Sequence, residues 1–349
     1  MPNKHLIFLV HGIGDHAANW SESAQKTIKD QYATYAQLSF IPFDERFAFV
    51  PILYNDEFEA LRKKWRDSTA ALGTALAGGA AVKGTDAQIV SDLNDIAKAT
   101  NKDTFINTHV VDVLLYVFAR QTAGTVRESV RKQIFTALTA LNRAEPITWS
   151  IIAHSLGTAV IHDALHEAYS DKPTKFGEKL AGITRPTLLA MIANVSRVCE
   201  TDCDVYKSRT RPGSPHDPDA VCRFYMNAHH DWDPIPKPKA FRPALHWPSI
   251  AVRMQNLYVD APISEIEQQN VHDLDHYLRN PLVHVPIFNC MLNRIAIDGD
   301  TLKTVHARFA AQTPLDRFGE WVATLKKFQL GEEASWKSIL PAWAATLKL

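Results

Sequence analysis

The sequence predicts an α/β fold with a mainly parallel central sheet and helices on both faces. Short β-type runs alternate with long helical stretches, which is the pattern of repeated strand–helix–strand units. Most of these runs are continuously apolar instead of alternating, as expected for strands that are covered on both faces. A chain of 349 residues is long enough for one large domain with a sizeable core.

Six strands are predicted from apolar runs that are bounded by polar or turn-forming residues. In chain order they are HLIFLV (5–10), RFAFVPILY (46–54), ITWSIIA (147–153), TLLAMIA (187–193), CRFYMNA (222–228) and MQNLYVD (254–260).

Apolar residues at a spacing of three or four predict helices between and after these strands. The three clearest stripes are Trp20, Ala24, Ile28 and Tyr32; Val126, Val130, Ile134 and Leu138; and Phe318, Val322 and Leu325. We interpret all three as faces that pack on the core.

Two regions exceed what a minimal sheet needs. The first is a mostly helical insertion at about 56–145, which we expect to form a cap within an α/β domain at 1–297. The second is a helical extension at 298–349, which we expect to pack on the same domain. The basic segment LRKKWR (61–66) in the insertion fits either a lid that admits lipid or a solvated helix face.

The bulk composition excludes several classes of function. Lys and Arg balance Asp and Glu at 38 each, so no global field attracts nucleic acid or an anionic membrane. No apolar run reaches 18 residues and no signal peptide is recognisable, so we expect a cytoplasmic protein without a transmembrane segment. Four cysteines, without histidines at ligand spacing, predict neither a disulfide scaffold nor a zinc site.

The segment AHSLG, at 153–157, carries the strongest chemical signal. It follows a predicted strand and precedes a predicted helix, so Ser155 lies on a tight strand-to-helix turn with His154 before it. Small residues at Ala153 and Gly157 allow such a turn to close and push the hydroxyl out at the end of the sheet. Ser155 is therefore a candidate nucleophile, although a serine that merely caps a helix is the simpler interpretation of the motif alone.

The segment FLVHGIGD, which ends the first strand, supplies a second part of such a site. Acyl transfer needs two backbone N–H groups that face the oxyanion, and in this sequence they are those of Leu156 and Ile13. Gly12 and Gly14, which follow His11, leave the backbone free to orient its amides. A phosphate-binding loop is the rival interpretation, but the glycine spacing fits neither GxGxxG nor a P-loop.

The later strands are followed by an acid and by several histidines. Asp233 comes after the fifth predicted strand and could hold an imidazole in the required tautomer, with Asp231 as the second candidate. His272, at a predicted loop-to-helix boundary, is the preferred base, and His276 one turn later is the alternative. His284 is interpreted as a packing residue.

Taken together, the motifs HGIGD, AHSLG and DPIP and the late histidine resemble the α/β-hydrolase family, in particular its lipases and esterases. The likeness covers roughly residues 5–285. Ala153 departs from the usual first glycine of the motif, and the C-terminal helices have no counterpart in the resemblance.

The resemblance implies an α/β-hydrolase fold with nucleophile Ser155, acid Asp233, base His272 and oxyanion amides of Ile13 and Leu156. It also implies ester hydrolysis through an acyl-enzyme, with no cofactor and no metal. The expected partner is a small-molecule or lipid ester, and a lipid substrate would add transient contact with a membrane surface. An acyltransferase or thioesterase with the same triad, or a noncatalytic binding module of the same fold, is the alternative.

Overall fold

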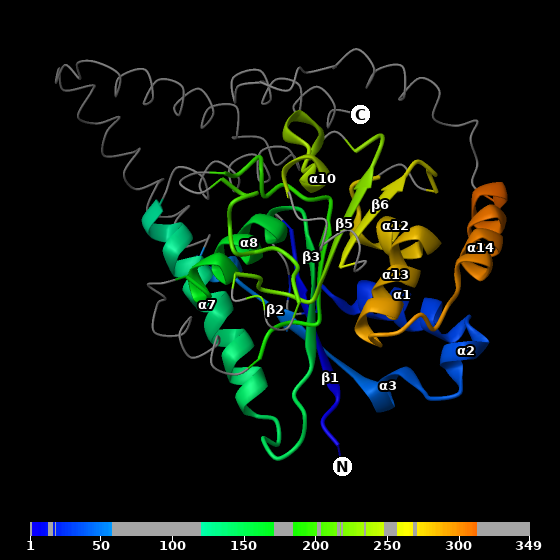
Figure 1. Cartoon of the computed structure of the whole chain (residues 1–349), viewed down its shortest axis with the longest axis horizontal. Helices are drawn as coiled ribbons and strands as arrows, with labels where there is room; N and C mark the ends of the chain where they lie inside the picture. The colour runs from blue at the N-terminus through cyan, green and yellow to red at the C-terminus, as the bar shows by residue number, and fades with distance from the viewer. Residues whose placement is uncertain are drawn as a thin grey trace.

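A computed structural model gives the architecture of the chain (Figure 1). The structure describes residues 2–12, 17, 19–57, 120–170, 184–200, 204–214, 217, 219–233, 235–247, 257–267 and 271–312. The segment 61–66 and the apolar stripe of Phe318, Val322 and Leu325 lie outside the described residues.

The centre of the fold is a six-stranded sheet in which every neighbouring pair of strands is parallel. The strand order is β2-β1-β3-β4-β5-β6. The strands are β1 (His5–Val10), β2 (Phe47–Ile52), β3 (Trp149–His154), β4 (Leu188–Ile192), β5 (Phe224–His230) and β6 (Tyr258–Ile263). The predicted α/β class is confirmed.

Both faces of the sheet are buried, each in its own hydrophobic cluster. Alternate residues of one strand enter different clusters: Phe8 of β1 belongs to one and Ile7 to the other, and both are fully buried. This alternation follows from the two-residue period of a strand. It also explains why the predicted strands are apolar throughout.

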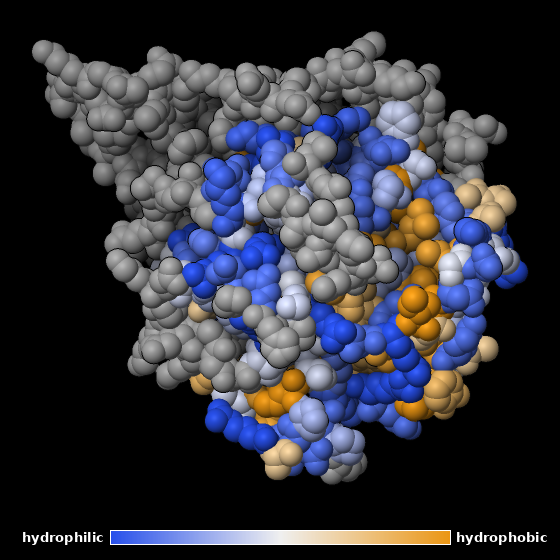
Figure 2. All heavy atoms as spheres, in the orientation of Figure 1, coloured by the Kyte–Doolittle hydropathy of each residue, from blue (hydrophilic) through white to orange (hydrophobic). Residues whose placement is uncertain are grey.

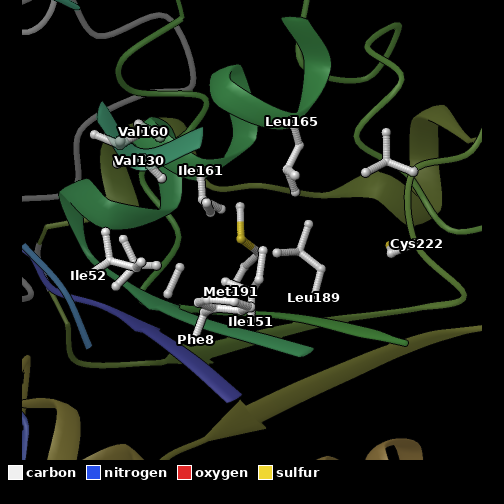
Figure 3. Close-up of a cluster of buried hydrophobic side chains, with 14 of the residues drawn as sticks. Phe8, Ile52, Val130, Ile151, Val160, Ile161, Leu165, Leu189, Met191 and Cys222 are labelled. Atoms are coloured by element: carbon white, nitrogen blue, oxygen red, sulfur yellow. The ribbon is translucent and has the colours of Figure 1, made fainter. Parts of the chain in front are cut away.

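Long helices cover the two faces from opposite sides (Figure 1). On the first face lie α7 (Arg120–Thr139) and α8 (Leu156–Ala168), and Figure 3 shows side chains of these helices above those of the strands. On the second face lie α1 (Glu22–Ala33), α12 (Leu274–Arg279) and α13 (Pro281–Met291).

The two apolar stripes that fall on described residues face the core as predicted. Ala24, Ile28 and Tyr32 of α1 are buried in the cluster of the second face, and Trp20 packs against it. The four residues of the α7 stripe are fully buried in the cluster of the first face: Val126, Val130, Ile134 and Leu138.

The C-terminal part of the insertion predicted at 56–145 packs on the sheet. Helix α7 contacts α8 and β2, so 120–139 forms part of the layer that covers the sheet. The apolar stripe of α7 requires this position, because a helix that caps a site does not bury one whole face in the sheet core. Residues 58–119 of the insertion lie outside the described residues.

The remaining elements are short or peripheral. They are α2 (Ala36–Ser39), α3 (Phe43–Arg46), the 3-10 helix η1 (Lys237–Lys239), α10 (Pro243–His246) and α14 (Gly299–Gln312). Helix α14, the described part of the predicted extension, packs against α13 but has no buried residue. Figure 2 shows apolar atoms at the surface around these two helices. No helix of the described residues is long and apolar enough to cross a membrane.

The last strand differs from its prediction. It was expected at 254–260, but β6 begins at Tyr258 and continues through Pro262 to Ile263. Proline is tolerated there because β6 is the last strand of the described sheet, and one side of its backbone has no strand neighbour among the described residues. Ala261 and Ile263 are buried in the cluster of the second face, which explains why the strand extends this far.

The strand order contains one reversal of direction. From β1 the chain passes to β2 on one side, and then returns to place β3 on the other side of β1. In open parallel sheets, ligands bind outside the carboxyl ends of the strands at such a switch point. Here those ends are followed by His11–Gly12 after β1 and by Ser155 after β3.

Candidate active site

Ser155 occupies a strained turn between β3 and α8, which we call the elbow. Its φ and ψ angles are 53° and −126°, a combination that side-chain-bearing residues rarely adopt. Its N–H donates to the carbonyl of Ile192 at the end of β4, 3.0 Å away, which anchors the turn to the sheet. Strain of this kind costs on the order of 1–3 kcal/mol and is concentrated at functional sites.

Close packing explains the small residues around the elbow. A Cβ atom on Gly157 would lie 2.3 Å from the carbonyl oxygen of His11, so only glycine lets α8 approach the end of β1. A Cβ atom on Gly12 would lie 2.9 Å from the Cβ atom of Ser155. Ala153, at the other small position, is fully buried in β3 beside Val10.

A continuous chain of hydrogen bonds joins Ser155, His272 and Asp233. His272 Nε2 lies 2.8 Å from Ser155 Oγ, and His272 Nδ1 lies 2.7 Å from Asp233 Oδ2. Because an ionised carboxylate only accepts, Nδ1 carries the proton and donates to Asp233. Nε2 then accepts from the hydroxyl of Ser155, which is the arrangement that a general base requires.

Asp233 is held ionised in a fully buried position. Burial favours the protonated carboxyl, but the charge and hydrogen bond of His272 and the donors Ile235 N and Tyr277 OH outweigh it. These donors lie 3.0 Å from Oδ1 and 2.8 Å from Oδ2, respectively. The pKa of Asp233 therefore lies below its ordinary value, and the carboxylate is charged at neutral pH.

Local structure fixes the position of His272. The next residue, Asp273, caps α12 by accepting from the backbone N–H groups of Asp275 and His276. The carbonyl of His272 accepts a hydrogen bond of 2.7 Å from His154 Nε2. Since His154 directly precedes Ser155, this contact ties the loop of the base to the elbow.

Of the two predicted oxyanion donors, the structure describes Leu156 but not Ile13. Leu156 is the first residue of α8 and is buried, so its N–H belongs to the helix N-terminus, which favours negative charge. Ile13 and Gly14 lie outside the described residues. His11 is buried with its ring stacked on Tyr54 at 4.0 Å between centroids, and the Tyr54 hydroxyl donates to the His11 carbonyl.

The other candidates lie apart from this chain of hydrogen bonds. Asp231 is exposed. His276 is buried in α12, and neither ring nitrogen has a hydrogen-bond partner in the described part of the chain. Burial and the neighbouring His230 lower the pKa of His276 to about 4. His284 is a packing residue, with Nε2 2.7 Å from the Tyr35 hydroxyl and Nδ1 2.9 Å from the carbonyl of Leu278 in α12.

A second series of serine, histidine and aspartate belongs to the buried structural hydrogen bonds around α8. His162 Nε2 lies 2.8 Å from Ser208 Oγ, and its Nδ1 lies 3.1 Å from Asp163 Oδ1. The Ser208 hydroxyl lies 3.0 Å from the carbonyl of Val205, to which it can donate, and it accepts from the N–H of Thr210 at 3.2 Å, so it also serves the surrounding backbone. Ser208 is a buried structural residue and a useful control for Ser155.

Tyr277 is a functional residue that was not predicted from the sequence. Its hydroxyl donates to Asp233 and accepts from the N–H of His230, so it links the acid to the end of β5. Burial and the Asp233 charge raise the pKa of Tyr277 well above its ordinary value, which keeps the donor protonated. Nothing local in the sequence marks this role, because the contact spans 44 positions.

No cluster of three or more metal-ligating side chains occurs among the described residues. Comparisons of the chain with family models, with curated proteins and with solved structures found no match. The function must therefore be argued from the chemistry of the site.

Proposed function

We propose that this protein is a serine hydrolase of the α/β-hydrolase kind that cleaves carboxylic esters through an acyl-enzyme on Ser155. One observation carries the proposal: the hydrogen-bonded series from Ser155 through His272 to a buried, ionised Asp233. Its position at the switch point of the sheet and the strained backbone of Ser155 support the same conclusion.

In the proposed reaction His272 Nε2 takes the hydroxyl proton while Ser155 Oγ attacks the carbonyl carbon of the ester. The tetrahedral intermediate collapses as the alcohol leaves with the proton from His272. Water then attacks the acyl-enzyme with His272 again as the base, and the acid is released as Ser155 recovers its proton. The Asp233 carboxylate stabilises the imidazolium that forms in both steps.

The N–H of Leu156 is the proposed donor to the oxyanion, with the N–H of Ile13 as the second donor expected from the sequence. The first turn of a helix leaves its N–H groups without intrahelical partners, and the helix dipole adds positive potential there. A donor of this type typically contributes on the order of a hundred- to thousandfold in rate.

Labelling with a fluorophosphonate probe tests the nucleophile. We expect the wild-type protein to be labelled and Ser155→Ala to be unlabelled, with unchanged circular dichroism. The matched control is Ser208→Ala, because Ser208 also contacts a histidine but is a buried residue without the positive φ of Ser155. Labelling of Ser155→Ala at the wild-type rate would overturn the assignment.

Analysis of the reaction products distinguishes an ester hydrolase from an acyltransferase or a thioesterase. A transferase or thioesterase would use the same three residues, so the acceptor and the leaving group must be varied. We expect p-nitrophenyl esters to release free acid, with no ester formed when an alcohol is added. Activity that rises with acyl chain length would favour a lipid substrate, and a maximum at acetate would favour small esters.

A further inference from the structure

A cavity lies at the amino-terminal ends of the strands, whereas the candidate active site lies at their carboxyl ends. It has a volume of about 660 Å³ and lies where the chain enters β1, β3, β4 and β5. Its lining includes His5, Thr148, Thr187 and Arg223, which begin or directly precede these strands. The volume falls within the range of about 300–1,000 Å³ that small-molecule sites occupy.

This cavity is separate from the site at Ser155. Thr148 directly precedes β3 and Ser155 directly follows it, and β3 has six residues. At about 3.3 Å per residue the two sites are roughly 20 Å apart, on opposite sides of a packed core. A ligand in the cavity would not touch the proposed catalytic residues.

The charged groups of the cavity are cationic. Arg185 and Arg223 line it, and no aspartate or glutamate occurs among the lining residues that the structure describes. The carboxylate of Asp217, which lies close to the lining residue Gly213, is paired with Arg211 at 3.0 Å. Burial lowers the pKa of His5 to about 4, so its ring is neutral and adds no charge. The arginines therefore determine the local potential.

Both guanidinium groups are supported by their neighbours. Arg185 Nη1 donates to the carbonyl of Asp217 at 2.5 Å, and its guanidinium carbon lies 5.9 Å from the centre of the Tyr169 ring. The guanidinium of Arg223 lies 5.2 Å from the centre of the Phe224 ring. Arg223 is exposed and makes no ion pair within the described residues. Groups that are ordered in advance lose less entropy when an anion binds.

Neutral polar groups complete the lining. Thr187 and Ser214 contribute hydroxyls that have no side-chain hydrogen bond in the described part of the chain, and Asn293 contributes an amide. Hydroxyl and amide groups can donate to the oxygens that two arginines leave unsatisfied. The lining thus offers charged forks together with neutral donors, which is the composition that phosphate and carboxylate groups select.

We propose that this cavity is a binding site for a small organic anion that carries phosphate or carboxylate groups. Arg223 would bind these groups through bidentate hydrogen bonds, the charge of Arg185 would add to the attraction, and the hydroxyls would fix their orientation. The proposal does not depend on the function of Ser155, since the cavity lies at the amino-terminal ends of the strands and Ser155 lies at their carboxyl ends.

Calorimetric titration of the full chain tests the site, with pyrophosphate and citrate as probes at constant ionic strength. We expect saturable binding of at least one probe with a stoichiometry of one, and the stronger of the two identifies the preferred class of anion. Loss of a charge-assisted pair typically weakens binding roughly ten- to hundredfold, which is the expected effect of Arg223→Gln. Ser155→Ala should bind like the wild type.

Two further variants make the test specific. Arg143→Gln removes the same charge from an exposed position outside the cavity and should leave the affinity unchanged. Ser214→Trp keeps both arginines but fills the cavity, and should abolish binding. Absence of saturable binding of both probes, or equal affinities for Arg223→Gln and Arg143→Gln, would overturn the proposal.

Discussion

Acidification should destabilise this protein well above the pH at which its carboxylates titrate. His5, His276 and His284 retain 8%, 1% and 1% of their surface, respectively. The pKa of each is lowered to about 4, chiefly because burial disfavours the charged ring. In the unfolded chain a histidine titrates near 6.5.

The sign follows from proton uptake. Between about pH 6.5 and pH 4 the unfolded chain binds protons at these three positions while the folded chain does not, so the free energy of unfolding falls as the pH falls. From pH 7 to pH 5 each histidine costs about 2 kcal/mol, since the slope approaches about 1.4 kcal/mol per pH unit. Three such residues together cost about 6 kcal/mol, a large part of a typical total stability.

Urea unfolding at pH 7, 6 and 5 measures this loss, and His276→Leu isolates one third of it. Because neither ring nitrogen of His276 has a partner in the described residues, leucine removes the titration without breaking a known hydrogen bond there. We expect the variant to be about 2 kcal/mol less sensitive to the change from pH 7 to pH 5.

The exposed His246 provides the control for this measurement. The variant His246→Gln should follow the wild-type dependence on pH. A wild-type stability that is constant between pH 7 and pH 5, or a His276→Leu variant with the full wild-type slope, would refute the reasoning.

Two further predictions concern the packing and polarity of the candidate site. Gly157→Ala places a Cβ atom 2.3 Å from the His11 carbonyl oxygen, so we expect a loss of about 1–3 kcal/mol in urea unfolding and slower fluorophosphonate labelling. Gly124→Ala, with nothing within 4 Å of its added Cβ atom, should be neutral or stabilising, and an equal loss in both variants would argue against the close approach at the elbow. Tyr277→Phe removes a donor to Asp233 and the partner of the His230 N–H, so the free energy of unfolding should fall by about 1–3 kcal/mol. Labelling by the probe should also slow in this variant, and an unchanged labelling rate would show that the tyrosine does not position the acid.

Local chemistry determined the features that the sequence alone could predict. The strands and the stripes of α1 and α7 follow from residue periodicity, because burial on one or both faces leaves a repeating pattern. The turn at Ser155 was recognisable for a similar reason, since the small residues Ala153 and Gly157 lie within two positions of it. Such signals are short in range and therefore survive without knowledge of the fold.

Tertiary structure decided which distant residues meet. His272 and His276 were both candidates, and only the fold brings His272 to Ser155 across 117 positions while burying His276 elsewhere. The support of Asp233 by Tyr277 and the extension of β6 to Ile263 also depend on partners remote in sequence. The physical reason is that a hydrogen bond depends on the distance between atoms in space, which residue spacing constrains only within a turn or two of the chain.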